Sequence, residues 1–360
     1  MVIISTGIAL TLASGLLTLL FLARGDLPYA IGAGVAALTT LLIHILDYYY
    51  AIAIISTGIV LVYSTIVLFS HNPRSPHESE LHFITTNTET SRDSTTYPLP
   101  KRGITTQIEE IELSVVIPCY NETKRLKIML EDAISYLRTT YDTKFEILIV
   151  DDGSKDGTAE YALDLAFNYF ELYPGQLRVV KLVKNRGKGG AVTHGIQHVR
   201  GKYAVFADAD GASQFSDVSK LIKAAESIKG PAVAVGSRAH MVNSDAVVKR
   251  SFIRNFLMYS LHTLVFVFGI RDIKDTQCGF KLFNKEAIVE IFPYMHTEGW
   301  IFDVEILIIA LRKQIPIKEV AISWHEVDGS KVDLAKDSIN MAIDLVVTRL
   351  AYIFGIYKDN

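Results

Sequence analysis

Two carboxylates stand two residues apart directly after an apolar stretch of the chain. Asp208 and Asp210 follow residues 203–207, a run that predicts a buried strand. In an extended chain residues i and i+2 point the same way, so both carboxylates can face one spot. Two hard oxygen ligands suit Mg²⁺ or Mn²⁺, which usually completes its coordination with substrate phosphates. Asp-x-Asp is also common in turns, so a structural role is an open alternative for the pair alone.

Three more groups of polar residues each follow a predicted strand. The strands are residues 113–117, 145–150 and 178–182, and the groups contain Pro118, Tyr120 and Glu122, then Asp151 and Asp152, then Lys184, Arg186, Gly187 and Lys188. Asp151 and Asp152 can accept hydrogen bonds from a base or a ribose. The glycine-rich stretch 187–190 lets the backbone approach a ligand and opens a helix whose N-terminus favours anions. Together with the three cations, these groups indicate a site for a nucleotide diphosphate.

Composition and missing motifs exclude other classes of protein. No Gly-x-x-x-x-Gly-Lys-Ser/Thr occurs, and the first strand–helix turn lacks Gly-x-Gly-x-x-Gly, which argues against a dinucleotide dehydrogenase. A net charge of −3 gives no electrostatic footprint for nucleic acid. The two cysteines, Cys119 and Cys278, fit neither a disulfide framework nor a zinc site, so buried thiols are the simpler interpretation.

The elements that position these groups alternate between strand and helix from residue 112 onward. Apolar residues at 126, 129, 130, 133, 134 and 137 mark one face of a helix, and further helices are expected at 158–169 and 189–199. Repeated βα units predict an α/β, Rossmann-like doubly wound sheet with helices on both faces. Ligands of such sheets bind at the carboxyl ends of the strands, where all four groups fall.

The N-terminal region is apolar. Uncharged runs at 2–22, 27–46 and 51–69 predict two or three transmembrane helices within residues 1–70. Because tyrosine prefers the headgroup level, the sequence Asp-Tyr-Tyr-Tyr at 47–50 predicts an interfacial break.

The rest of the chain divides into three parts by composition. Residues 71–110 are rich in Ser, Thr, Pro and His and predict a flexible polar linker. The α/β domain is expected at residues 111–335. Residues 336–360 are expected to form a C-terminal apolar helix that can associate with the membrane.

The chain resembles the inverting family 2 glycosyltransferases, which have the GT-A fold. The resemblance covers about residues 112–331 and is specific because its motifs occur together and in order. The motifs are residues 116–122, 150–158, 184–192, 207–212, 236–238, 275–281 and 300–305. Gly211, Ala212 and Ser213 after the fourth strand favour the branch that glucosylates a polyprenyl phosphate over the mannosyl branch. The Gln-x-x-Arg-Trp motif of processive synthases is absent from the sequence.

The resemblance implies an activity and roles for particular residues. Glucose would pass from UDP-glucose to dolichyl phosphate with inversion, using Mg²⁺ or Mn²⁺, at the cytosolic face of the endoplasmic reticulum membrane. By position, the uridine is held by Asp151, Asp152 and the region of Pro118, the metal by Asp208 and Asp210, a phosphate by Arg238, and the acceptor by Asp275, Gln277 and Lys281. The apolar runs before residue 50 depart from the family pattern of one N-terminal span and leave the topology open.

A phosphate acceptor on a lipid needs cations and a route from the membrane. The cations expected to neutralise the acceptor are Arg238, Arg250, Arg254 and Lys281, with a solvated helix flank as the alternative for Arg250 and Arg254. Asp303 is expected to orient the acceptor or the sugar, or else to cap a helix at 304–311. The apolar run 252–268 predicts a helix at the lipid surface, with a core helix as the alternative.

Three other readings of the sequence stay open. A transferase of the same family could use GDP-mannose or UDP-N-acetylglucosamine. The chain could also bind nucleotides at the membrane without turnover, although the carboxylate pair argues for catalysis. A transporter is disfavoured because the apolar runs contain no paired charges.

Overall fold

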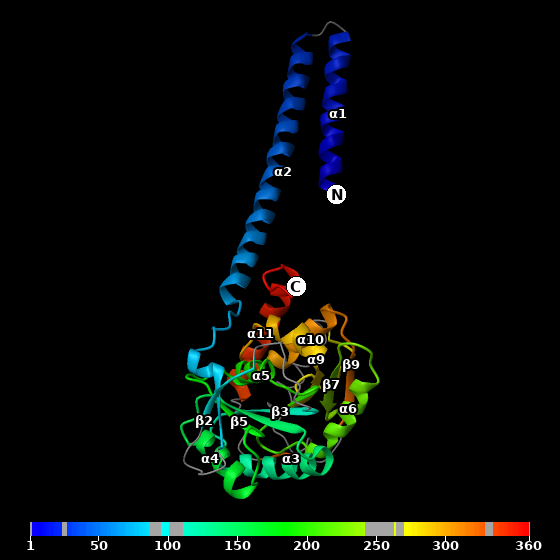
Figure 1. Cartoon of the computed structure of the whole chain (residues 1–360). Coiled ribbons are helices and arrows are strands. Elements are labelled where there is room, and N and C mark those ends of the chain that lie inside the picture. Colours follow the sequence, from blue (N-terminus) through cyan, green and yellow to red (C-terminus); the bar gives the residue numbers. More distant parts are fainter. Residues whose placement is uncertain are drawn as a thin grey trace. The chain divides into compact units, whose positions relative to one another are not determined.

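The computed structural model describes residues 2–23, 27–86, 95–100, 111–241, 263, 270–327 and 334–359. The chain divides into two compact units, Met1–Phe69 and Ser70–Asn360, each of which is described by itself. Figure 1 labels the helices and strands of both units.

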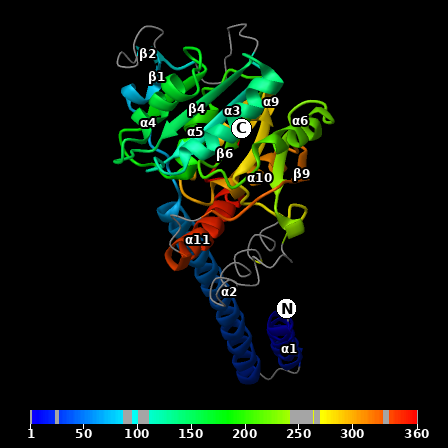
Figure 2. The ribbon, with the colours of Figure 1, turned by 90° about the horizontal axis from the view of Figure 1, so that it is seen from below.

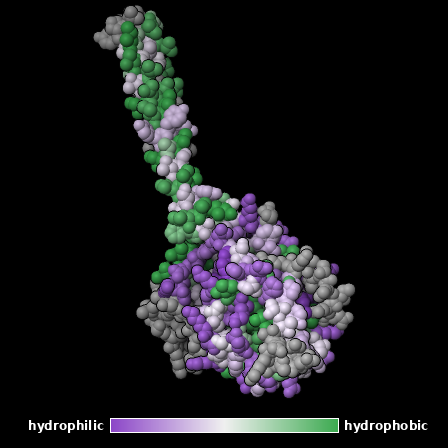
Figure 3. All heavy atoms as spheres, turned by 60° about the vertical axis from the view of Figure 1, so that its left-hand side comes forward, coloured by the Kyte–Doolittle hydropathy of each residue, from purple (hydrophilic) through white to green (hydrophobic). Residues whose placement is uncertain are grey.

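The N-terminal unit contains two apolar helices, α1 (Val2–Ala23) and α2 (Leu27–Phe69). The predicted break at residues 47–50 is wrong, because α2 continues through them and they include no proline or glycine. At 1.5 Å per residue the 43 residues of α2 extend for about 65 Å, roughly twice the hydrocarbon thickness of a bilayer. Within the described residues, Ala30–Phe69 is long and apolar enough to cross a membrane. Figure 3 shows its hydrophobic surface.

A mixed sheet forms the centre of the second unit, in the order β2-β1-β5-β4-β3-β6-β8-β7-β9. Strands β3 to β6 are parallel where they pair, whereas β8 is antiparallel to both β6 and β7. The strands are β1 (His82–Thr85), β2 (Thr95–Pro98), β3 (Leu113–Cys119), β4 (Phe145–Asp151), β5 (Leu177–Lys181), β6 (Tyr203–Ala207), β7 (Val233–Ser237), β8 (Phe280–Asn284) and β9 (Ile317–Ala321). The expected α/β sheet is confirmed, with two strands, β1 and β8, antiparallel to their neighbours.

Helices cover both faces of this sheet because its side chains alternate. Val115, Ile147 and Val205 pack with residues of α3, α4 and α6. On the other face Val116 lies under α5, and the Phe206 ring meets a ring of α10 at 5.6 Å. Figure 1 shows a helical layer on each side of the sheet, and Figure 2 looks onto the side that α3 covers. The helices are α3 (Leu126–Tyr141), α4 (Thr158–Asp164), α5 (Lys188–Ile196), α6 (Val218–Glu226), α9 (Lys285–Ile291), α10 (Phe302–Arg312) and α11 (Leu334–Ile353).

Much of the region expected to be a flexible linker belongs to the folded unit. After the short 3₁₀ helix η1 (Glu78–Leu81), strand β1 pairs with β5, and β2 pairs with β1. The linker prediction is therefore wrong for residues 71–86 and 95–100. The polar composition of this region gives no sign of these strands, which are stabilised by pairing of β1 with β5 and of β2 with β1. Residues 87–94 and 101–110 lie outside the described part of the chain.

The C-terminal helix α11 packs against the same unit. Leu345, Ala351 and Tyr352 are buried, whereas Ile343 and Ile353 are exposed. The unit thus extends beyond the expected limits of 111–335 on both sides. Membrane association of α11 stays a prediction.

Candidate active site

The strands that precede the polar groups end side by side. The parallel register pairs Cys119 with Asp151 and Val116 with Phe206, so the carboxyl ends of β3, β4 and β6 form one edge. Asp208 and Asp210 follow β6 at this edge. The expected convergence of the strand ends is confirmed.

Asp208 is enclosed by Gly279 and Lys188. Its backbone N–H donates to the Gly279 carbonyl at 3.1 Å, and Lys188 Nζ lies 2.6 Å from Oδ1. A Cβ on residue 279 would lie 2.0 Å from Asp208 Oδ2, so only glycine leaves room for this carboxylate. Burial would lower the pKa of Lys188, but Asp208 and Asp303 raise it above its usual value. The Lys188 ammonium is therefore charged at neutral pH.

Asp210 faces an arginine that the sequence analysis did not single out. Arg125 Nη1 lies 4.0 Å from Asp210 Oδ2, and two hydrogen bonds of 2.9 and 2.7 Å to Glu122 fix its guanidinium. Burial and the nearby Asp208 raise the pKa of Asp210. Glu122, expected at the nucleotide, thus grips Arg125. The sequence offered one sign of this pair, because Glu122 and Arg125 lie three residues apart just before a helix.

Asp151 and Asp152 are buried and accept hydrogen bonds from neighbouring loops. Asp151 Oδ1 accepts the Ser154 N–H at 3.0 Å. Asp152 accepts the N–H groups of Arg186 at 2.7 Å and Gly187 at 2.9 Å. Burial raises the pKa of both carboxyls, that of Asp152 to about 6. Contact with uridine stays a prediction, but Asp152 already ties the end of β4 to the glycine-rich loop.

The glycines of that loop lie against protein backbone. Gly187 has a φ of +89°, and a Cβ there would lie 2.5 Å from the Glu298 carbonyl oxygen. A Cβ on Gly189 would lie 2.5 Å from Phe302 Cβ. The Gly190 N–H donates to the Glu298 carbonyl at 3.0 Å. The sequence analysis explained these glycines by the close approach of a ligand. They also leave room for residues 298–302, the segment that leads into α10.

Lys281 and Asp303 form a buried ion pair. Lys281 is 0% exposed, contacts Asp303 Oδ1 and donates to the Cys278 carbonyl at 3.1 Å. The Lys281 ammonium is enclosed and paired with Asp303, so a contact with the acceptor phosphate would need this pair to open, and that role stays a prediction. The capping alternative for Asp303 is wrong, since Ile301 occupies the N-cap position of α10. A role for Asp303 in orienting a substrate stays a prediction.

Arg238 is held in place but partly exposed. Its Nε and Nη2 donate to Asp275 at 2.7 and 2.9 Å, and its guanidinium lies 5.5 Å from the Trp324 ring centre. Its Nη2 also donates to the Gln277 carbonyl at 3.4 Å. With 33% of its side chain exposed, Arg238 can meet a phosphate as well as Asp275. The roles predicted for Asp275 and Gln277 at the acceptor are untested.

For the other predicted site residues the structure gives only their exposure, or they lie outside the described part of the chain. Tyr120 and Lys184 are exposed and Pro118 is half-buried at the strand ends. Arg250 and Arg254 lie outside the described residues, as does the run 252–268 apart from residue 263. Their predicted contacts with phosphate and lipid are therefore untested.

The donor atoms at Asp208 and Asp210 fit a divalent cation. Apart from its ion pair with Lys188, Asp208 Oδ1 is buried and has no hydrogen-bond partner among the described residues. No group of three His, Cys, Asp or Glu side chains suited to a metal occurs within the described ranges. Mg²⁺ commonly takes only one or two carboxylates and fills its shell with water and substrate phosphates. A pair of carboxylates is therefore sufficient.

Two surface cavities of about 410 and 470 Å³ lie at the opposite ends of the strands. Ile111 and Arg200 line both of them, beside the starts of β4 and β6. None of the predicted site residues lines either cavity. These two cavities therefore lie apart from the predicted site at the carboxyl ends of the strands.

Fold and motifs together define a glycosyltransferase of the GT-A type. The model of glycosyl transferase family 2 matches residues 114–292. A solved structure of glucosyl-3-phosphoglycerate synthase from Mycobacterium tuberculosis, in complex with uridine diphosphate, has a TM-score of 0.50 and 17% identity. It covers 66% of this chain and 80% of that chain, which shows the shared fold.

Curated relatives define the family more narrowly. The dolichyl-phosphate β-glucosyltransferase of Saccharomyces cerevisiae is 59% identical over 308 residues, or 83% of this chain and 92% of the relative. The Homo sapiens protein of the same description is 41% identical over 311 residues, with the same two coverages. The chain therefore belongs to the dolichyl-phosphate β-glucosyltransferase family.

Proposed function

We propose that the protein transfers glucose from UDP-glucose to dolichyl phosphate with inversion, giving dolichyl β-D-glucosyl phosphate for protein N-glycosylation. The observation that carries this proposal is the 59% identity to the Saccharomyces cerevisiae relative over 83% of the chain. The strand-end site supports it, because a carboxylate pair stands there with Lys188, Arg125 and Arg238.

The reaction asks little of a general base. A phosphate monoester with a second pKa of about 6 is mostly a dianion at neutral pH, so its oxygen can attack the sugar carbon directly. The protein holds this acceptor near the sugar and favours departure of the diphosphate. Arg238 is the partly exposed cation best suited to the phosphates. A divalent metal held by Asp208 and Asp210 would supply further neutralisation of the diphosphate.

The proposed location is the endoplasmic reticulum membrane, with the site facing the cytosol. Helix α2 supports membrane attachment by its length and apolar composition. A lipid acceptor also favours tethering, since a membrane span keeps the enzyme at a high local concentration of its substrate.

The first experiment uses membranes that contain the full chain, dolichyl phosphate, and Mg²⁺ or Mn²⁺. Labelled UDP-glucose, UDP-N-acetylglucosamine and GDP-mannose are supplied one at a time, and the lipid is extracted. We expect label from UDP-glucose alone, lost with a chelator or with Asp210→Asn. Asp164→Asn, an exposed carboxylate of α4, is the matched control that keeps activity. Label from another donor would show that the transferred sugar is not glucose. No lipid label from any donor would contradict the proposal that dolichyl phosphate is the acceptor.

A further inference from the structure

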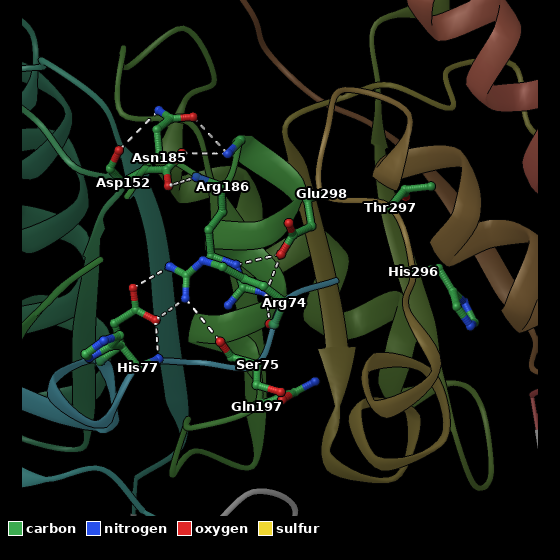
Figure 4. A network of polar contacts seen from close by, with 12 residues as sticks. Arg74, Ser75, His77, Asp152, Asn185, Arg186, Gln197, His296, Thr297 and Glu298 are labelled. Carbon is green, nitrogen blue, oxygen red and sulfur yellow. Dashed lines mark hydrogen bonds and ion pairs between the residues drawn. The ribbon is translucent and has the colours of Figure 1, made fainter. Parts of the chain in front are cut away.

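The segment that follows α2 has no part in the proposed chemistry, yet it contacts the site. Residues 70–81, called here the juxtamembrane segment, precede the region matched by the family model, which begins at residue 114. They lie against residues 183–188, called here the donor loop, which contains Arg186, Gly187 and Lys188. Figure 4 shows this contact.

Glu80 of the juxtamembrane segment holds the beginning of the donor loop. Its carboxylate is 0% exposed and accepts the Val183 N–H at 2.8 Å. The same carboxylate accepts Arg74 Nη1 and the His77 N–H, each at 2.8 Å. Burial alone would raise the pKa of Glu80, but these donors lower it to about 2. The carboxylate is therefore ionised at neutral pH and is held in place by these donors.

Arg74 holds the middle of the donor loop through its backbone. Arg186 Nη2 donates to the Arg74 carbonyl at 3.1 Å, and Arg186 Nε donates to Glu298 at 2.6 Å (Figure 4). The Arg186 backbone N–H is bound by Asp152 at 2.7 Å. Arg186 is thus held by Arg74, Asp152 and Glu298, which are far apart in sequence.

A third contact reaches the helix that the donor loop opens. His194 of α5 lies with Nε2 2.8 Å from the Glu80 carbonyl oxygen, and both residues are buried. The juxtamembrane segment therefore contacts the donor loop at Val183 and Arg186, and it contacts α5 at His194. A segment that served only as a tether would not need these buried polar contacts.

We propose that the juxtamembrane segment is a working part of the nucleotide-sugar site, in which Glu80 and Arg74 position the donor loop and so set the affinity for the donor. The identity of that donor rests on the proposed function. Glu80 and Arg74 act as positioning residues, because neither needs to touch the substrate. The rival explanation is that the contacts only add stability to the fold.

The test compares Glu80→Gln with the native full chain in detergent or nanodiscs. We expect the KM for UDP-glucose to rise about tenfold, while kcat at saturating donor and the KM for dolichyl phosphate stay near native values. Amide hydrogen exchange should become faster in residues 183–188, with or without UDP-glucose. Glu160→Gln is the matched control, since it removes an exposed carboxylate that pairs with Lys181 on β5 and should change neither reading.

A second variant covers the case in which Glu80→Gln does not fold. Arg74 is 34% exposed, so Arg74→Gln removes its bonds to Glu80 at smaller risk and should show the same changes in weaker form. Native KM for the donor together with native exchange of the donor loop in either folded variant would overturn the proposal. If the native chain does not bind UDP-glucose, the proposed donor fails, but amide exchange still decides whether Glu80 holds the loop.

Discussion

Charge compensation in the site differs from one carboxylate to the next. Asp208, Asp303 and Asp275 each face a lysine or an arginine, whereas Asp152 is compensated mainly by backbone N–H groups. Amide donors compensate less charge than an ammonium group, and burial raises the pKa of Asp152 to about 6. Protonation in a mildly acidic medium therefore reaches Asp152, whereas the pKa of Asp275, which burial would raise, is held below its usual value by Arg238.

Donor affinity should fall as the pH drops through 6. A protonated Asp152 cannot accept both the Arg186 and the Gly187 N–H groups, so the donor loop loosens. We expect the KM for UDP-glucose to rise about fivefold between pH 7.5 and pH 5.5, roughly the effect of one net hydrogen bond. Asp152→Asn should have a high KM that varies less with pH. Parallel pH profiles for the native chain and the variant would contradict this assignment.

The contribution of Asp152 to stability has the opposite sign. Its pKa is raised in the folded chain, so between about pH 4 and pH 6 the folded state holds a proton that the unfolded state releases. This carboxyl therefore makes the fold less stable as the pH rises through that window. A loss of donor affinity that follows protonation of Asp152 is therefore not caused by this carboxyl making the fold less stable.

Replacing either member of the Lys281–Asp303 pair alone should destabilise the fold, whereas replacing both by apolar residues should cost much less. Lys281→Met or Asp303→Asn leaves one buried charge without its partner, which costs about 3–5 kcal/mol of unfolding free energy. The double change Lys281→Met with Asp303→Leu should recover most of that loss. Denaturant unfolding of the purified full chain measures the three variants. Single variants within about 1 kcal/mol of native would show that the pair is not enclosed as described.

At the scale of elements, the site depends on the meeting of β6 and β8. Gly279 lies one residue before β8, and its Cα is the surface against which Asp208 packs. Since β8 runs antiparallel to β6, its beginning returns to the carboxyl end of β6. The position of one carboxylate of the pair is thus set by an element some seventy residues away in the sequence.

Gly279→Ala should disable the carboxylate pair without unfolding the sheet. The new methyl group would lie 2.0 Å from Asp208 Oδ2, so the carboxylate must move. We expect activity to fall about 100-fold and the Mg²⁺ concentration for half-maximal activity to increase. In the control, Gly299→Ala, the new methyl would lie 3.9 Å from Asp344 Oδ2, an ordinary contact. Equal effects of both substitutions would contradict the inference that Asp208 needs a glycine at position 279.

Sequence patterns predicted the elements whose stability is local. Strands β3 to β6 and helix α3 were found because their apolar periodicity reports burial directly. Strands β1 and β2 were missed because pairing, of β1 with β5 and of β2 with β1, makes them strands, and their composition does not. The contacts of Gly187 with Glu298 and of Asp208 with Gly279 join residues distant in sequence, so spacing alone could not predict them. Arg125 was missed because its role depends on the turn that precedes α3.

At the scale of the whole molecule, an apolar N-terminal unit and a catalytic unit are joined at Phe69 and Ser70. Helix α2 is roughly twice as long as a bilayer's hydrocarbon core, and residues 47–50 lie near its middle. Residues 51–69 form an apolar length sufficient for one crossing. Such a crossing would put Tyr49 and the juxtamembrane segment on opposite sides of the membrane.

Cysteine labelling can test this topology. Tyr49→Cys and Ser79→Cys are made one at a time, and the native Cys119 and Cys278 are buried and stay silent. In intact microsomal vesicles an impermeant maleimide should label position 79, whereas position 49 should react only after permeabilisation. Labelling of both positions from outside would place residues 49 and 79 on one side and exclude a crossing between them.

The junction between the two units also bears on how such proteins diversify. Glu80 and Arg74 belong with the donor loop, although they precede the region matched by the family model at residue 114. A recombination that exchanged membrane anchors at residue 114 would separate these residues from the loop they hold. An exchange of anchors that keeps these contacts therefore has to be made at or before residue 69, well ahead of the region that the family model matches.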